Sequence, residues 1–371
     1  MISRTNILVA LALSSVCALP LGAQVQLPAG KDPNDWEAYF DYGVEQLRVN
    51  GGVALKAFEY ASRLDPTRAE PLHGRFVAFW MANPIEDFIA WLDGNRVQEA
   101  RRDVRAADSL YTMAVQRNPF LHRGMEIILF DRFSGRFRSD RATRARIAYS
   151  TGKFAEAASL YTQMIERNPD ENVWRRYDRA LSRVMLPDID GALADVQAVL
   201  AELRREEDAA EELSYYRSKE ALLHMIGLIY VQKSNLAAAR TAFGEALVEN
   251  AGFAYAQAAL ANVSRVERKP REAVDEFALA IELAPTDPVI RWWYAQALSD
   301  AGRYDQAVIE ARKVVEAEPL WAAPHFVIGR ARERQGRTSE MNSAYAAYVA
   351  RAPMADPTSR ALRQRFPALA R

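Results

Sequence analysis

Histidine is the residue type in this sequence best suited to metal binding or to acid–base chemistry near neutral pH. It occurs at four positions, His73, His122, His224 and His325. The sequence has no H-E-x-x-H motif, and no two histidines lie on one helical turn, as a zinc site on a helix would require. We therefore interpret the histidines as structural and expect neither a metal site nor a cofactor.

Other motifs of catalysis are also absent. The sequence contains no G-x-S-x-G, Walker A or G-x-G-x-x-G pattern. One carboxylate, Glu126 in GMEIILF, has apolar neighbours in sequence. We interpret it as a helix-end or salt-bridged glutamate; the alternative is that the apolar setting raises its pKa, as an acid catalyst requires. No partner carboxylate is evident at the spacing that glycoside hydrolysis needs. We expect no enzyme and no catalytic residue, and a hydrolase of envelope polymers at Glu126 is kept as an alternative.

Arginines alternate with phenylalanines in FDRFSGRFRSDRATRAR, which starts at Phe130. Such a segment can bind phosphate or acidic groups. The chain as a whole has 48 basic and 48 acidic residues, so no overall field attracts nucleic acid or an anionic membrane, and we expect no nucleic-acid partner. A solvated loop, and contact with anionic lipid or an acidic protein surface, are both open interpretations. The residues for such contact are Arg132, Phe133, Arg136 and Arg138.

The first 24 residues have the layout of a secretory signal peptide. Arg4 precedes an apolar run from Ile7 to Leu13, followed by Pro20 and small residues. The run is shorter than the roughly 20 apolar residues of a membrane-spanning helix. The only cysteine, Cys17, lies in this leader, so the mature chain would have no disulfide. We expect an exported protein, periplasmic or extracellular, with an uncleaved anchor or a lipidated Cys17 as alternatives.

Any functional side chains must be positioned by a repeat that recurs every 34 residues near the C-terminus. Pro285, Pro319 and Pro353 show this spacing, and it divides the chain into blocks 220–253, 254–287, 288–321 and 322–355. Small residues and large residues recur at fixed columns, which allows two antiparallel helices to approach closely. The eighth column has Gly227, Ala261, Ala295 and Gly329; the twentieth has Ala239, Ala273, Ala307 and Met341; the twenty-fourth has Phe243, Phe277, Ala311 and Tyr345.

These columns resemble the tetratricopeptide repeat (TPR) family. The resemblance departs from the family pattern at the fourth column, where Gln257, Arg291 and His325 replace the usual tryptophan. It implies an all-α fold, a right-handed superhelical solenoid of antiparallel helix pairs whose first helices line a concave face. Adjacent Trp292 and Trp293 cannot both face this groove, so one of them is expected between repeats. The groove residues implied by the resemblance are His224, Tyr255, Asn262, Trp292, Gln296, Phe326 and Arg330.

The front of the chain contains weaker copies of the same unit. The phrases SLYTMAVQRNP and SLYTQMIERNP end at Pro119 and Pro169, and a similar segment ends at Pro66. Their wider spacing predicts TPR-like repeats over residues 25–213 with longer or inserted helices. Four regular repeats would follow over 214–355, and residues 356–371 would form a capping helix or a tail.

The leading functional hypothesis is an exported scaffold that binds a protein or peptide through the concave face of residues 220–355. The alternative from another class is an envelope assembly component that self-associates or contacts anionic lipid through the arginine–phenylalanine segment. The sequence leaves open the partner, the oligomeric state and the continuity of the two halves. Membrane contact is left open and is not predicted.

Overall fold

The computed structural model describes residues 25–83, 85–92, 102–133, 140–168, 173–208 and 218–367. The predicted leader, including Cys17, lies outside these ranges. Regular structure within them is helical and includes no strand. The helices are α1 (Trp36–Gln46), α2 (Gly51–Leu64), α3 (Glu70–Ala82), α4 (Ile85–Leu92), α5 (Arg102–Arg117), α6 (Glu126–Phe133), α7 (Arg141–Ser150), α8 (Phe154–Arg167), α9 (Trp174–Val184), α10 (Ile189–Asp208), α11 (Lys219–Gln232), α12 (Leu236–Glu249), α13 (Ala254–Val266), α14 (Pro270–Leu283), α15 (Pro288–Asp300), α16 (Tyr304–Ala317), α17 (Ala323–Arg334), α18 (Thr338–Arg351) and α19 (Pro357–Arg365).

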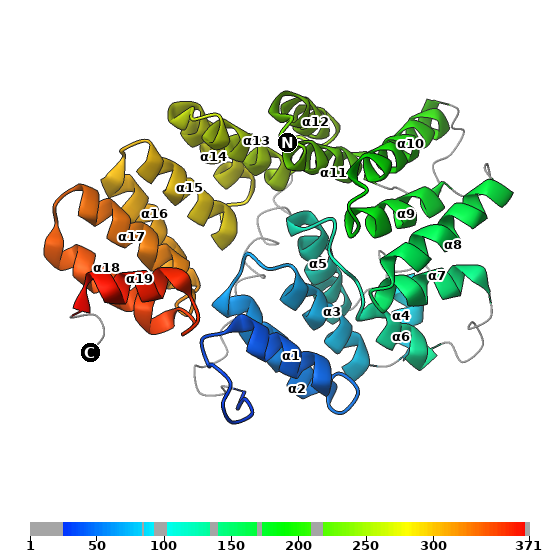
Figure 1. Cartoon of the computed structure of the whole chain (residues 1–371), viewed down its shortest axis with the longest axis horizontal. Coiled ribbons are helices and arrows are strands. Elements are labelled where there is room, and N and C mark those ends of the chain that lie inside the picture. Colours follow the sequence, from blue (N-terminus) through cyan, green and yellow to red (C-terminus); the bar gives the residue numbers. More distant parts are fainter. Residues whose placement is uncertain are drawn as a thin grey trace, which may run out of the picture.

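Successive helices pack as pairs, and successive pairs stack on one another (Figure 1). The pairs α11/α12, α13/α14, α15/α16 and α17/α18 each correspond to one of the 34-residue blocks, with α11 starting one residue before its block. This arrangement confirms the predicted all-α solenoid of antiparallel helix pairs. Helix α10 packs on α11, so the front half (α1–α10) and the back half (α11–α19) form one continuous stack.

The small and large columns of the repeat meet inside each helix pair. A Cβ atom added to Gly227 would lie 2.3 Å from a ring carbon of Phe243, and one added to Gly329 would lie 2.4 Å from the ring of Tyr345. Both distances are far below van der Waals contact, so these two positions have room only for hydrogen. The front half repeats the arrangement, because Gly43 and Gly74 both press on the Phe58 ring.

The turns between paired helices also repeat. Gly302 and Gly336 have φ of +76° and +69°, and the following amide hydrogen-bonds to the carbonyl five residues back. This is the left-handed ending that glycine adopts without a Cβ penalty. Ser234 and Arg268 hold the same place in the earlier repeats, with φ of 57° and 59°. The turn geometry is therefore imposed by the packing of the helix pair even where glycine is missing.

The front half is less regular, as the wider proline spacing predicts. Short helices α4 and α6 are inserted, and α10 is lengthened to 20 residues. Buried Arg179 makes a bidentate ion pair with Asp195, at 2.6 and 2.8 Å, and Arg183 donates to the same carboxylate at 2.8 Å. This fully paired network fixes α9 against α10.

The solenoid closes on itself, so that the back half contacts the front half along a line that we call the seam. Near its ends, Asn34 Nδ2 donates to the Ala350 carbonyl at 3.1 Å, and Asp32 accepts from the Met354 amide at 2.7 Å. Leu320 packs on the front-half cluster of Tyr39, Ala61 and Leu64. Residues that are 316 and 322 positions apart thus become neighbours.

Candidate functional site

The centre of the seam is a buried hydrogen-bond network around Arg117, the last residue of α5. Its Nε donates to the Tyr255 hydroxyl at 2.8 Å, and its guanidinium also donates to the Pro66 carbonyl. The Tyr255 hydroxyl donates in turn to Asp287 at 2.9 Å, and that carboxylate lies 3.8 Å from the Arg117 guanidinium. Burial alone would lower the pKa of Arg117, but Tyr255 and Asp287 hold it above its usual value, so the charge is retained.

Asp287 also fixes the back half at this point. It is the N-cap of α15, and its second oxygen accepts from the amides of Val289 and Ile290 at 2.8 and 3.1 Å. A second ion pair of the seam lies nearby, with Arg63 Nε 3.6 Å from Glu318. Arg117 of the front half is thus paired with a carboxylate whose position is fixed by its role as the N-cap of α15.

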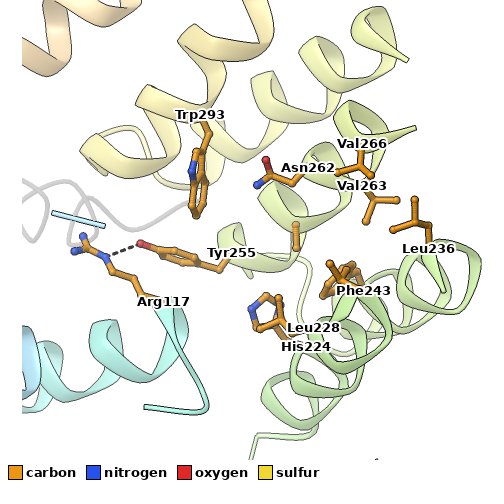
Figure 2. A pocket seen from close by; sticks show the side chains of 12 residues that line it. Arg117, His224, Leu228, Leu236, Phe243, Tyr255, Asn262, Val263, Val266 and Trp293 are labelled. Carbon is orange, nitrogen blue, oxygen red and sulfur yellow. Dashed lines mark hydrogen bonds between the residues drawn. The ribbon is translucent and has the colours of Figure 1, made fainter. Parts of the chain in front are cut away.

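Next to this network is a cavity of about 260 Å³ (Figure 2). Most of its wall belongs to the first helices of three consecutive repeats, α11, α13 and α15, with α12 behind them. Among the described residues, Arg117 is the lining residue that the front half contributes. The full lining is Arg117, His224, Leu228, Val231, Leu236, Phe243, Tyr255, Ala259, Asn262, Val263, Val266 and Trp293.

The pocket carries little net charge. His224 is 4% exposed, and burial lowers the pKa of its imidazole to about 4, so it is neutral at neutral pH. Burial also raises the pKa of Tyr255, which keeps the phenol protonated. The Arg117 charge is balanced by Asp287.

A strip of polar side chains starts at the pocket and crosses three repeats, and we call it the polar ladder. Arg265 donates to Asn262 at 3.3 Å and to Gln296 at 3.5 Å, and it pairs with Asp300 at 3.1 Å. Arg330 extends the strip, 3.9 Å from Asp300. The charged members are a quarter to a half exposed, so solvent and ligands can reach them. The ladder consists of Asn262, Arg265, Gln296, Asp300 and Arg330.

Five of the seven predicted groove residues lie in these two features. His224, Tyr255 and Asn262 line the pocket, while Asn262, Gln296 and Arg330 belong to the ladder. Asn262, which is labelled among the pocket residues in Figure 2, belongs to both features.

The other two predicted residues lie elsewhere. Trp292 packs between repeats, with its ring 5.0 Å from that of Trp321, and it is its neighbour Trp293 that lines the pocket. Phe326 lies against Tyr345 and Tyr348 in the core of the last pair. Both rings are therefore part of the apolar packing of the last repeats.

Sequence reasoning missed Arg117, Arg265 and Asp300. Arg265 follows the predicted Asn262 by three residues, and Asp300 follows the predicted Gln296 by four. These spacings place each pair on one helical face, so the helical periodicity could have predicted them. Arg117 gives no such signal, because it is 138 residues from Tyr255.

The raised pKa that the catalytic alternative at Glu126 requires is not found, and Glu126 is instead the first residue of α6 in contact with His73. Burial does act to raise the pKa of Glu126, but a contact with His73 at 3.3 Å and the positive charge of Arg123 outweigh burial and lower the pKa. A lowered pKa keeps this carboxyl ionised, which is unsuited to an acid catalyst near neutral pH. The apolar neighbours in sequence did not reveal the polar partners supplied by α3 and by the chain before α6.

The middle of the arginine–phenylalanine segment, residues 134–139, lies outside the described residues. Arg136 and Arg138 lie outside the described residues, and so do the side chains of Arg132 and Phe133 at the end of α6. Within the described ranges, no helix has the length and hydropathy that a membrane span requires. No three histidine, cysteine, aspartate or glutamate side chains of this part of the chain converge on a metal-sized site.

No protein-family model and no curated protein matches the sequence. Solved structures similar to this one are TPR proteins. YrrB, a TPR protein with an unusual peptide-binding site, is 20% identical with a TM-score of 0.42, over 57% of this chain and 100% of that one. A TPR protein from Parabacteroides merdae is 16% identical with a TM-score of 0.44, over 78% and 97% of the two chains.

The Cut9–Hcn1 complex of the APC/C is similar over more of this chain. It is 11% identical with a TM-score of 0.47, and the match covers 92% of this chain and 78% of that one. At these values the similarities do not identify a partner, and the fold assignment rests on the helix pairs described above.

Proposed function

We propose that this chain is a TPR scaffold that binds an extended segment of a protein partner along the polar ladder. The observation that carries the proposal is the continuity of the ladder over three repeats. The Asn262 and Gln296 amides lie 34 positions apart on successive first helices, and Arg265 orients both by binding their oxygens.

The free groups of the ladder suit a peptide backbone. Neither side-chain NH₂ of Asn262 or Gln296 makes a hydrogen bond to another described residue, and each oxygen keeps a second lone pair. An amide side chain can therefore donate to a backbone carbonyl and accept from a backbone N–H. Each such bond contributes about 1 kcal/mol.

The test starts from peptides selected for binding to the purified chain from a random displayed library. Affinity for a selected peptide, labelled with a fluorophore, is measured by anisotropy. We expect a variant with Asn262→Ala and Gln296→Ala to bind roughly 10-fold or more weakly, as two lost hydrogen bonds imply.

The matched control removes an exposed asparagine and an exposed glutamine that are not part of the ladder, with Asn342→Ala and Gln364→Ala. This variant should bind like the wild type. Equal affinity of the two double variants, or failure to select any peptide, would overturn the proposal.

We also propose that the chain is exported, on the basis of the leader pattern in residues 1–24. Expression of the full sequence in a bacterial host, followed by mass spectrometry of the intact product, tests this directly. A product in the periplasm or medium that lacks about 23 residues at its N-terminus supports export. A full-length product confined to the cytoplasm would exclude it.

A further inference from the structure

The structure points to an aromatic anchor: we infer that the pocket beside the ladder binds one uncharged aromatic side chain of the partner. The inference rests on the proposed function, because the side chain enters from a peptide on the ladder. Asn262 belongs to both features, so a peptide bound at this amide has a side chain within reach of the cavity.

The size of the cavity fits one ring system. An apolar cavity of about 150 Å³ holds benzene. The volume here is about 260 Å³, enough for a phenol or an indole and too small for a drug-sized ligand of the usual pocket range. Glycine or alanine would leave most of this space empty and forgo the dispersion contacts with its walls.

The walls suit a flat apolar group. Leu228, Phe243, Ala259 and Val263 present hydrocarbon. The rings of Tyr255 and Trp293 meet edge to face, with centroids 6.2 Å apart and planes at 86° (Figure 2). An aromatic ring that contacts these two rings gains binding free energy from the aromatic contacts in addition to that from its buried apolar area.

Electrostatics disfavour a charged occupant. The charged lining residue is Arg117, which repels an ammonium, and its charge is already compensated by Asp287, so a carboxylate would have to compete with that pair. Transfer of an unpaired charge into an apolar pocket is costly. The Asn262 NH₂ makes no hydrogen bond to another described residue and can donate to a phenol oxygen, while the second lone pair of Asn262 Oδ1 can accept from a phenol O–H or an indole N–H.

The test uses N-acetyl-5-fluorotryptophanamide as a probe, observed by fluorine NMR with the full chain. We expect saturable binding that Ala259→Phe, which fills the cavity, weakens at least 10-fold. The matched control Ala346→Phe places the same ring on an exposed face of α18 and should bind the probe like the wild type. N-acetylglutamate amide should compete far less than N-acetylphenylalaninamide.

A second measurement does not depend on tolerance of the larger ring. In a Cys17→Ser background, Ala259→Cys places the only thiol in the pocket wall. The probe should slow alkylation of this thiol and should not slow alkylation after Ala346→Cys. Equal alkylation rates with and without the probe, or unchanged probe binding by Ala259→Phe, would overturn the inference.

The two proposals fail in different ways. Peptides that need the ladder but carry no aromatic residue would remove the aromatic anchor and leave the scaffold proposal in place. Probe binding without any selected peptide would overturn the scaffold proposal and, with it, the assignment of the pocket to a partner's side chain, and would leave only an aromatic-binding cavity.

Discussion

At the scale of single residues, burial of neutral His224 links the stability of the back half to pH. Its pKa is lowered by burial from 6.5 to about 4. Between these values the unfolded chain binds a proton that the folded chain does not. The stabilising contribution is therefore complete above pH 6.5 and is lost as the pH falls toward 4. Its full size is on the order of 3 kcal/mol, from 1.36 kcal/mol per pKa unit.

We predict that His224→Gln removes this dependence. The unfolding free energy of the wild type minus that of the variant, measured with urea, should fall by about 1–3 kcal/mol between pH 7 and pH 4.5. His325 has a similarly lowered pKa, and burial raises the pKa of Glu318, but both groups are present in both proteins. A difference that stays constant with pH would show that His224 is not a buried neutral group.

Arg268 occupies a turn position with left-handed backbone conformation, where a residue other than glycine lowers the stability of the fold. Its φ of 59° lies in the left-handed region, which costs a side-chain-bearing residue about 1–2 kcal/mol. We predict that Arg268→Gly raises the unfolding free energy by about 0.5–1 kcal/mol once the extra chain entropy of glycine is subtracted. Arg312→Gly, in the exposed middle of α16, should lower it by about 1 kcal/mol. Equal effects of the two changes would contradict the turn geometry.

At the scale of elements, the repeat depends on contact between glycine and an aromatic ring within each helix pair. Gly227 and Gly244 belong to the same pair but differ in their surroundings. A Cβ at Gly227 would collide with Phe243, whereas a Cβ at Gly244 has nothing within 4 Å. Substitution of Gly244 is therefore a control, within the same helix pair, for substitution of Gly227.

We predict opposite effects of the same substitution at these two sites. Gly227→Ala should lower the unfolding free energy by about 1–3 kcal/mol, because the buried ring has no space to move. Gly244→Ala should raise it by up to about 1 kcal/mol, because alanine favours an open helix position. Thermal and urea unfolding of the two variants measure this, and destabilisation by both would contradict the packing described here.

The elements could be predicted from sequence because each column of the repeat depends on neighbours within one block. Gly227 and Phe243 are 16 positions apart, and the pattern recurs every 34 residues. The site could be predicted only in part. The choice between Trp292 and Trp293 depends on how two repeats stack, and the pKa of Glu126 depends on His73, 53 residues away. Arg117 enters the pocket only because the solenoid closes, which no local pattern encodes.

At the scale of the whole molecule, closure turns an open groove into a site shared by both halves. The seam brings Arg117 to Tyr255 and Asp287, and it places a buried cation in the wall of the pocket with its charge compensated. Glu318, opposite Arg63, has a raised pKa because of burial, so this pair is less favourable than the Arg117 network. A ligand that fills the pocket contacts both halves and should favour the closed form.

Closure is the central structural claim, and one cross-linking measurement tests it most directly. In a Cys17→Ser background, Pro33→Cys and Ala355→Cys place two exposed thiols beside the seam contact between Asp32 and Met354 without removing it. A short bis-maleimide applied to dilute protein should join the two thiols within one molecule. The pair Pro33→Cys and Ala237→Cys, with the second thiol on α12, should not be joined. Absence of an intramolecular product from the first pair, although both of its thiols react with a monofunctional maleimide, would contradict a closed solenoid.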